Sequence, residues 1–466
     1  MSHSQAQGNV NRGVQFHQRG ELDAAETIYR TVLKAHPENA DALHLLGVIA
    51  KQRRNYSEAT RLIEQAIALC PQGENSADYH NNCAEAYRAD FQYPQAFQHY
   101  QAALTLTGKA TVALLFNLGG CFQELGQHHE AIPCFDQAIA LQPDYARAYF
   151  RRAYAYLALG QFEQGWRDYE WHVQALNNER YIRPPWGGAV LGRPSDNLPA
   201  AWANSRTLLL ADQGLGDEIC LLRFAPRLAA LGTEVTYAAP DKLAELLKRN
   251  ATVALWDGVD RAFDHIYTLS DLPRLTSMTE LSQLPAPVTL KPAPEALRAY
   301  QQPLHELPRP WVGITWRAGL TQALQSQRKE LPLAELLAVL QKFQGTLVVL
   351  QRDIDSTEAD LLTATANTHA YKILDLSRQS DQVEDALAIM HLLDDYVAVA
   401  NTNVHLRAAL GQPSQVLTAV NAIDYRWPAD QPGSAWFPGS QAYRQGTDGS
   451  WSQALKTLHT KLFETG

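Results

Sequence analysis

The feature that most constrains the fold of this chain is a repeat in its first 172 residues. Small residues recur there at separations of 34, 37, 35 and 34 positions, at Ala25, Ala59, Ala96, Ala131 and Gly165. Four positions after each of them comes a large side chain: Tyr29, Ile63, Tyr100, Phe135 and Tyr169. A period of this length predicts stacked helical hairpins, in which the small residues let paired helices approach closely.

Two further sets of positions keep the same period. Twelve residues before the small residues lie Gly13, Gly47, Ala84, Gly119 and Ala153, and twelve residues after three of them lie Pro37, Pro71 and Pro143. The pattern resembles the tetratricopeptide repeat, and we assign residues 1–175 to about five such hairpins. The third unit, 77–108, lacks the proline. The resemblance implies a concave face that binds a protein or peptide; the alternative is that the repeats only stabilise the remaining domain or pair two copies of the chain.

Composition excludes several classes of partner. The 466 residues carry a net charge of −9 without a basic cluster, so we expect neither nucleic acid nor an anionic membrane as a partner. The start of the chain lacks a signal-peptide core, and no apolar run is long enough to span a membrane, so a cytoplasmic location is expected. Five cysteines, without a CxxC pair or a Cys/His cluster in the sequence, are interpreted as core residues rather than disulfides or zinc ligands: Cys70, Cys83, Cys121, Cys134 and Cys220.

The second half alternates between predicted strands and helices. A Pro/Gly-rich linker, 176–205, precedes it. Strands are expected at 207–211, 234–239, 262–269, 311–316, 346–351, 396–400 and 414–418. Helices are expected at 218–231, 241–249, 332–343, 382–393, 404–411 and 451–463. The Pro-rich stretch 284–310 would form a hinge between two Rossmann-like lobes, 206–305 and 306–466, with ligands at the carboxyl ends of the strands.

A glycine turn opens the first of these lobes. Gln213, Gly214, Gly216 and Asp217 lie between the first predicted strand and its helix. Glycine lets a ligand approach the backbone, and the helix start offers free N–H groups to an anionic or hydroxyl-rich ligand. The turn is neither a GxGxxG fingerprint nor a P-loop. A purely structural strand-to-helix turn is the alternative.

The order of short motifs resembles a known family over residues 10–455. The motifs are GWxxYEW, PPWxG, QGLGD, VGITWRAG, LQRD, NTNVHLRAALGQP, DYRWP and SAWFPGSQAYRQ. Together they resemble bacterial tetratricopeptide-repeat proteins fused to a GT-B glycosyltransferase domain of the heptosyltransferase or O-GlcNAc-transferase type. The resemblance implies two lobes, a nucleotide-sugar donor mainly at the second lobe, an acceptor at the first, and no metal or other cofactor.

Glycosyl transfer requires a base for the acceptor proton and cations or N–H groups for the departing phosphate. The resemblance assigns the base to Asp217; the alternative is that Asp217 caps the following helix. Gln213, Gly214 and Gly216 form the predicted acceptor loop. The predicted donor-binding residues are Arg317, Arg328, Lys329, Gln351, Arg352, Asn401, Thr402, Asn403 and His405. For any one of the cations, a solvated loop position is the alternative, and Thr402 and Asn403 can equally be helix N-cap residues.

Two other features favour structural roles. Asp353-Ile354-Asp355 spells DxD, a metal motif of a different transferase class, but we interpret it as the cap of a helix starting at Ser356. The aromatic segment around Trp427 and Trp436 is expected to pack the tail across both lobes. Two alternatives to a protein-modifying transferase stay open: a scaffold that has lost turnover, favoured by Asn401 where relatives carry an acid, and a transferase acting on a lipid or oligosaccharide.

Overall fold

The computed structural model describes residues 1–175, 202–250, 253–259, 262–318, 329–419, 424–446 and 449–463. It divides into two compact units, 1–151 and 152–466. The division falls inside the predicted repeat segment, so the end of the repeats belongs to the second unit. Most of the predicted linker lies outside the described residues.

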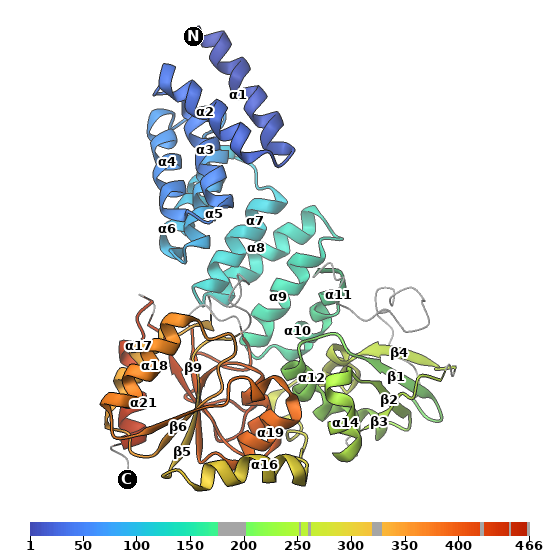
Figure 1. Ribbon diagram of the computed structural model, residues 1–466. Coiled ribbons are helices and arrows are strands. Elements are labelled where there is room, and N and C mark those ends of the chain that lie inside the picture. The colour runs from blue at the N-terminus through green and yellow to red at the C-terminus, as the bar shows by residue number, and fades with distance from the viewer. Residues whose placement is uncertain are drawn as a thin grey trace. The chain divides into compact units, whose positions relative to one another are not determined.

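The first unit is a series of helical hairpins (Figure 1). Its helices are α1 His3–Gln18, α2 Leu22–Ala35, α3 Ala40–Gln52, α4 Tyr56–Leu69, α5 Ser76–Ala89, α6 Tyr93–Thr107, α7 Val112–Glu124 and α8 His128–Leu141, and α9 Ala146–Ala158 begins in it. Each of α1, α3, α5 and α7 packs against the helix that follows it. The predicted hairpins are therefore confirmed.

Helix contact within a hairpin depends on the small residues of the repeat. A Cβ added to Gly119 would lie 2.7 Å from Cε1 of Phe135, closer than carbon atoms can pack. Ala131, one turn before Phe135 on α8, is fully buried. The small residues therefore recur in the sequence because each one lies where the two helices of a hairpin are in contact.

The ends of the hairpins follow the sequence as well. Pro37, Pro71 and Pro143 each lie two residues beyond the last residue of a helix. In the third hairpin, which lacks this proline, α6 ends instead at Gly108 in a left-handed conformation with φ 61°. Glycine adopts this conformation without strain, so it ends a helix as effectively as proline does.

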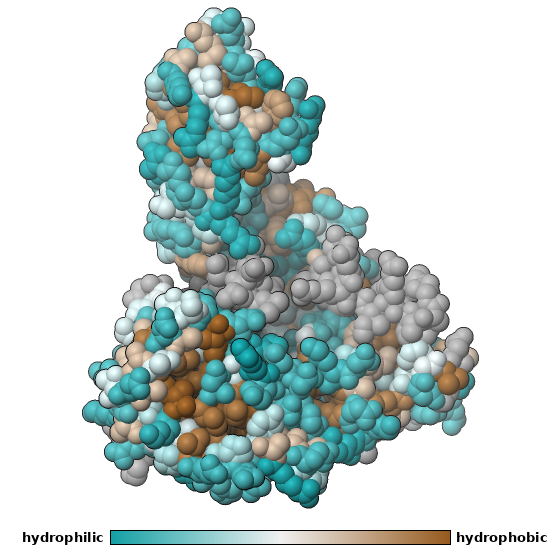
Figure 2. Space-filling view, in the orientation of Figure 1, coloured by the Kyte–Doolittle hydropathy of each residue, from teal (hydrophilic) through white to brown (hydrophobic). Residues whose placement is uncertain are grey.

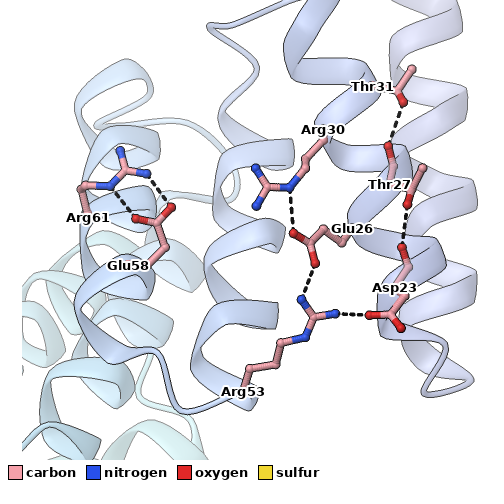
Figure 3. A network of polar contacts seen from close by, with 8 residues as sticks. All are labelled: Asp23, Glu26, Thr27, Arg30, Thr31, Arg53, Glu58 and Arg61. Atoms are coloured by element: carbon pink, nitrogen blue, oxygen red, sulfur yellow. Dashed lines mark hydrogen bonds and ion pairs between the residues drawn. The ribbon is translucent and has the colours of Figure 1, made fainter.

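Charged side chains link neighbouring hairpins at the surface. Arg53, after α3, pairs with Asp23 and Glu26 of α2, and Glu26 also pairs with Arg30 (Figure 3). Hydrophilic residues predominate on the face of the repeats seen in Figure 2. The apolar residues are instead buried between the helices, as the pattern predicts.

The second unit contains two separate parallel sheets (Figure 1). The first has the order β3-β2-β1-β4, from β1 Arg206–Leu210, β2 Glu234–Ala238, β3 Ala254–Leu255 and β4 His265–Thr268. The second has the order β10-β9-β8-β5-β6-β7, from β5 Trp311–Thr315, β6 Thr346–Val349, β7 Lys372–Asp375, β8 Asp395–Val399, β9 Gln415–Thr418 and β10 Gln441–Arg444. Every strand pairing in both is parallel. An α/β architecture with two strand series is therefore present.

Helices lie before, between and after these strands along the chain. They are α10 Phe162–Tyr169, α11 His172–Ala175, α12 Leu215–Leu221, α13 Ala225–Ala229, α14 Asp241–Asn250, α15 Leu272–Leu275, α16 Pro294–His305, α17 Leu333–Val339, α18 Ser356–Thr368, α19 Val383–Leu392, α20 Thr402–Ala409 and α21 Ser452–Phe463. Among the described residues, no helix is long and apolar enough to cross a membrane.

Some predicted elements were wrong. The helix expected at 218–231 begins at Leu215, and a 3₁₀ turn, Leu222–Phe224, separates α12 from α13. Pro226 causes the break, because it lacks the N–H that a continuous helix needs. The Pro-rich stretch 284–310 contains the helix α16, which Pro294 starts. The short edge strands β3, β7 and β10 were not predicted.

Candidate functional site

A cavity of about 300 Å³ lies in the second unit at the carboxyl ends of β5, β6 and β8. Gly214, Gly216 and Asp217 line it from the first-sheet side, and the turn 400–406 lines it from the second-sheet side. Every predicted donor-binding residue in the described part of the chain lines this cavity. Arg328 lies outside the described residues, and Gln213 points elsewhere, donating a hydrogen bond to Ser270 at 3.0 Å.

The two walls meet where α12 crosses α20. A Cβ on Gly216 would lie 2.8 Å from Cδ2 of His405, so only glycine allows this approach. The His405 ring also packs edge-on against Phe437, with centroids 4.8 Å apart. Burial, together with the charge of the nearby Arg426, lowers the pKa of His405 to about 3, so this histidine is neutral.

Asp217 lies in the first turn of α12 and faces a cation across the cavity. Its Oδ1 accepts a hydrogen bond of 2.5 Å from Nη1 of Arg426. Burial alone would raise the pKa of Asp217, but the charge and hydrogen bond of Arg426, together with His405, outweigh burial and lower it. Asp217 is not the N-cap of α12: Gly214 occupies that position, and Asp217 lies in the first turn of the helix.

Arg426 and Asp424 are site residues that the sequence interpretation missed. Arg426 donates two hydrogen bonds to Asp424, of 2.8 and 2.9 Å, in addition to the one to Asp217. Burial opposes the charge on Asp424, yet Arg426 lowers its pKa below the usual range. The signal in the sequence was the charged pair inside DYRWP, a motif quoted above as part of the family resemblance and without a role for either residue.

Two of the predicted donor residues support the strand ends. Oε1 of Gln351 accepts from the backbone N–H groups of Trp316 and Arg317, at 3.1 and 2.8 Å, and so joins the ends of β5 and β6. The buried guanidinium of Arg317 pairs with Glu358 at 2.5 Å and donates to the carbonyl of Asp353. The positive charge of Arg317 is therefore already neutralised by the carboxylate of Glu358.

Lys329 and Arg352 are the more accessible cations among the predicted donor-binding residues; Lys242, which is exposed, also lines the cavity. Arg352 has a half-exposed side chain, and its nearest carboxylate, Asp381, is 3.9 Å away. The positive charge of Lys329 contributes to the lowered pKa of Asp424. An anionic ligand can engage Lys329 and Arg352 without first breaking a buried pair.

The turn after β8 is organised by Asn401. Its Oδ1 accepts from the N–H groups of Asn403 and Val404, and its Nδ2 donates to the hydroxyl of Tyr396 at 3.0 Å. Asn401 is therefore the N-cap of α20, and the proposed N-cap role for Thr402 and Asn403 was wrong. Thr402 and Asn403 instead line the cavity.

The DxD sequence caps a helix, as predicted. The carboxylate of Asp355 accepts a hydrogen bond from the N–H of Glu358 at 2.8 Å, and the carboxylate of Glu358 accepts one from the N–H of Asp355. This reciprocal capping box starts α18.

The aromatic tail joins elements of both sheets, as expected. The buried Arg223, which follows α12, donates to the carbonyl of Trp436 at 3.0 Å. Trp427 stacks on Phe437 with centroids 4.9 Å apart, and both rings line the cavity.

Buried polar contacts fix the residues on either side of the glycine turn. Nε2 of His172, on α11, lies 2.7 Å from Oδ2 of Asp212, the residue before Gln213. Glu218, the residue after Asp217, accepts a hydrogen bond from Tyr237, and burial raises its pKa to about 7. The turn that carries Asp217 is therefore fixed at both of its ends.

Comparison with known proteins defines the class of the first part of the chain. Three family models described as tetratricopeptide repeat match residues 16–74, 75–144 and 134–167. Residues 16–167 are tetratricopeptide repeats, a protein-interaction module, and an α/β region follows them.

Among particular relatives, Protein FlbA of Caulobacter vibrioides is 22% identical over 539 aligned positions, covering 97% of this chain and 89% of FlbA. Matches to trd-1 of Caenorhabditis elegans (26%) and the mouse DnaJ homolog subfamily C member 7 (29%) cover about a third of this chain, and 18% and 33% of those proteins. A crystal structure of MamA aligns with 35% of this chain and 94% of its own, at 22% identity and a TM-score of 0.32. The TPR protein YrrB, whose structure is described as having an unusual peptide-binding site, aligns with 37% of this chain and 86% of its own, at 19% identity and a TM-score of 0.33.

Proposed function

We propose that the α/β region is a GT-B glycosyltransferase that moves a sugar from a nucleotide-sugar donor to a protein or peptide bound by the repeats. The observation that carries the proposal is the shared cavity: Asp217 and Thr402, which follow strands of two different sheets, line the same space. In parallel α/β sheets, ligands bind at the carboxyl ends of the strands.

In the proposed site, the donor diphosphate lies against the turn 400–406, between Lys329 and Arg352. The start of α20 adds the positive end of its dipole. Thr402 and Asn403 offer hydrogen bonds to the phosphate oxygens. Asp355 is committed to its capping box, so DxD contributes no metal ligand to the proposed reaction.

In the proposed reaction, Asp217 takes the proton from the acceptor hydroxyl. Its pairing with Arg426 keeps its pKa low, and a carboxylate in that state is a weak base. If Arg426 turns toward the donor phosphates, burial raises the pKa of Asp217 while the guanidinium stabilises the charge on the leaving diphosphate. Donor binding and activation of the base would then occur together.

The test begins with the melting temperature of the full chain in the presence of UDP-, GDP- and ADP-sugars. We expect one nucleotide class to raise it, in wild type and in Asp217→Asn alike. Hydrolysis or transfer should fall by about 100-fold or more in Asp217→Asn. Asp241→Asn, an exposed acid at the start of α14, is the matched control and should keep full activity.

A catalytically inactive scaffold is the second candidate. The ion pair that occupies Asp217 and the amide of Asn401, where an acid is common, favour it. It predicts no stabilisation by any donor. The acceptor class is tested with a radiolabelled donor: label in the protein fraction supports the first proposal, and label only in lipid or free oligosaccharide contradicts it.

A further inference from the structure

The second and third hairpins of the repeats bring together side chains with the chemistry of metal ligands. Cys83 of α5, His99 of α6 and Glu64 of α4 each offer one donor atom, and these atoms all lie within 4.8 Å of one another. They come from three helices and are 16 to 35 positions apart in the sequence, so no familiar ligand spacing reveals them.

The distances suit a tetrahedral ion. Nε2 of His99 is 3.7 Å from Sγ of Cys83 and 3.9 Å from Oε1 of Glu64. Zinc bonds of ordinary length at a tetrahedral angle would separate sulfur from nitrogen by about 3.6 Å and nitrogen from oxygen by about 3.4 Å. A shift of a few tenths of an ångström in these side chains would bring the Sγ–Nε2 and Nε2–Oε1 distances to these values.

A neighbouring histidine orients the ring of His99. Nδ1 of His80 lies 2.9 Å from Nδ1 of His99. When Nδ1 of His99 donates this hydrogen bond, its Nε2 carries a lone pair toward Cys83 and Glu64. Metal-bound histidines usually donate their second N–H in this way, which fixes the tautomer and the ring.

We propose that Glu64, Cys83 and His99 bind Zn²⁺, with His80 as the residue that positions His99. Thiolate, imidazole and carboxylate together favour zinc over the harder cations magnesium and calcium. Cys83 is fully buried, the Glu64 side chain is half exposed, and Oε1 of Glu64 also accepts a hydrogen bond from the hydroxyl of Tyr87. This site lies in the repeats and is separate from the proposed transferase cavity.

The protonation states agree with this arrangement. Burial lowers the pKa of both His80 and His99, so both rings are neutral. A neutral His80 can accept the hydrogen bond from His99, and a neutral His99 can bind a metal ion. Burial also raises the pKa of the Cys83 thiol, with Glu64 adding to the effect. Cys83 is therefore a thiol in the free protein, and metal binding must release its proton to solvent.

Metal binding is tested on the full chain after chelation and removal of the chelator. Cobalt(II) is titrated first, since a thiolate ligand gives it a charge-transfer absorption, and zinc is then added to displace it. We expect one equivalent per chain, proton release on binding, and a higher melting temperature with zinc. Absence of thiolate absorption, or no tight binding of zinc at micromolar concentration, overturns the proposal.

Variants assign the ligands. Cys83→Ser and His99→Gln should each weaken zinc binding by at least about 100-fold, and His80→Phe by about 10- to 100-fold. Cys134→Ser is the matched control: this buried thiol bonds only to the carbonyl of Glu130 within its own helix, and its loss should leave binding unchanged. If Cys83→Ser does not fold, the exposed Glu64→Gln provides the same comparison. Wild-type affinity in both His99→Gln and Glu64→Gln would exclude this site.

Discussion

Asp217 and Arg426, 209 positions apart in the chain, form an ion pair across the candidate cavity. The pair extends to Asp424, which Arg426 holds with two further hydrogen bonds. The Arg426 and Asp424 side chains are 14% and 8% exposed, whereas Asp217 is 36% exposed, so solvent weakens the Asp217 contact more. Asp424 is therefore the more firmly bound partner of the Arg426 guanidinium, and Asp217 is the partner that a ligand would displace more easily.

Arg426→Gln should destabilise the protein by about 2 to 4 kcal/mol, since it leaves the buried Asp424 without its cation. Urea denaturation at pH 7 measures this loss. The same variant should abolish transfer while Asp217 remains in place. Arg444→Gln, on β10, provides a control arginine from the same tail. Retained activity in Arg426→Gln would show that the guanidinium does not serve the leaving group.

Gly216→Ala should lower stability by about 1 to 3 kcal/mol, because the new methyl group would press on the His405 ring. It should also weaken donor binding by moving α20. Gly214→Ala is the control: it has an extended backbone with φ −71°, and the atom nearest to its new Cβ would be 3.6 Å away. Equal melting temperatures for the two variants would contradict the close approach of α12 and α20.

Lys329→Ala should weaken nucleotide binding by about tenfold, the loss expected for one charge-assisted hydrogen bond to phosphate. Calorimetric titration with the nucleotide identified above gives the affinity. Lys342→Ala, an exposed lysine outside the cavity, should bind as wild type does. Unchanged affinity in Lys329→Ala would remove Lys329 from the donor site.

His405 should make stability depend on pH. Its folded pKa of about 3 lies below an unfolded value of about 6.5, so the unfolded chain binds the proton first as pH falls. The stabilising effect is complete above about pH 6.5 and is lost as pH falls toward 3. The charged groups that influence this ring are Arg426, Asp217, Asp424 and Arg223.

His405→Gln should therefore reduce the stability difference between pH 7 and pH 5 by about 1 to 2 kcal/mol. The measurement is urea denaturation at the two pH values. His391→Gln, at an exposed position of α19, should leave the difference unchanged. An identical pH dependence in wild type and His405→Gln would show that His405 does not resist protonation.

Gly119→Ala should destabilise the repeats by about 1 to 3 kcal/mol, because the methyl group would collide with Phe135. Gly8→Ala makes the opposite prediction within the same unit. Gly8 is helical and has no atom within 4 Å of an added Cβ, so alanine should stabilise α1 by about 0.5 to 1 kcal/mol. Thermal unfolding of both variants tests the packing at Gly119.

The repeats were predictable because their pattern is local and recurs. Each small residue and the large residue four positions later lie on one helix, so the period alone identifies the touching faces. The strands of the second half were predictable where they are central and apolar, as in Trp311–Thr315. The edge strands β3, β7 and β10 were missed because neighbouring strands, rather than their own residues, determine them.

The candidate site was predicted in part for a similar reason. Residues that directly follow a strand, such as Asn401 and Gln351, can be located from the order of elements. Their partners cannot: nothing near Asp217 in the sequence indicates Arg426, and nothing near Arg317 indicates Glu358. For the same reason Cys83 gave no hint of His99. Side-chain pairs between distant segments depend on tertiary packing.

The bond from Arg223 to the carbonyl of Trp436 has a practical consequence. Trp436 is almost completely buried against Phe224, and its indole lies beneath the Arg223 guanidinium. Any hinge motion that draws one sheet away from the other must pull this arginine off the tail and let water reach the indole. Trp436 is one of ten tryptophans in the chain, and its contribution to the intrinsic fluorescence should shift if the two sheets separate.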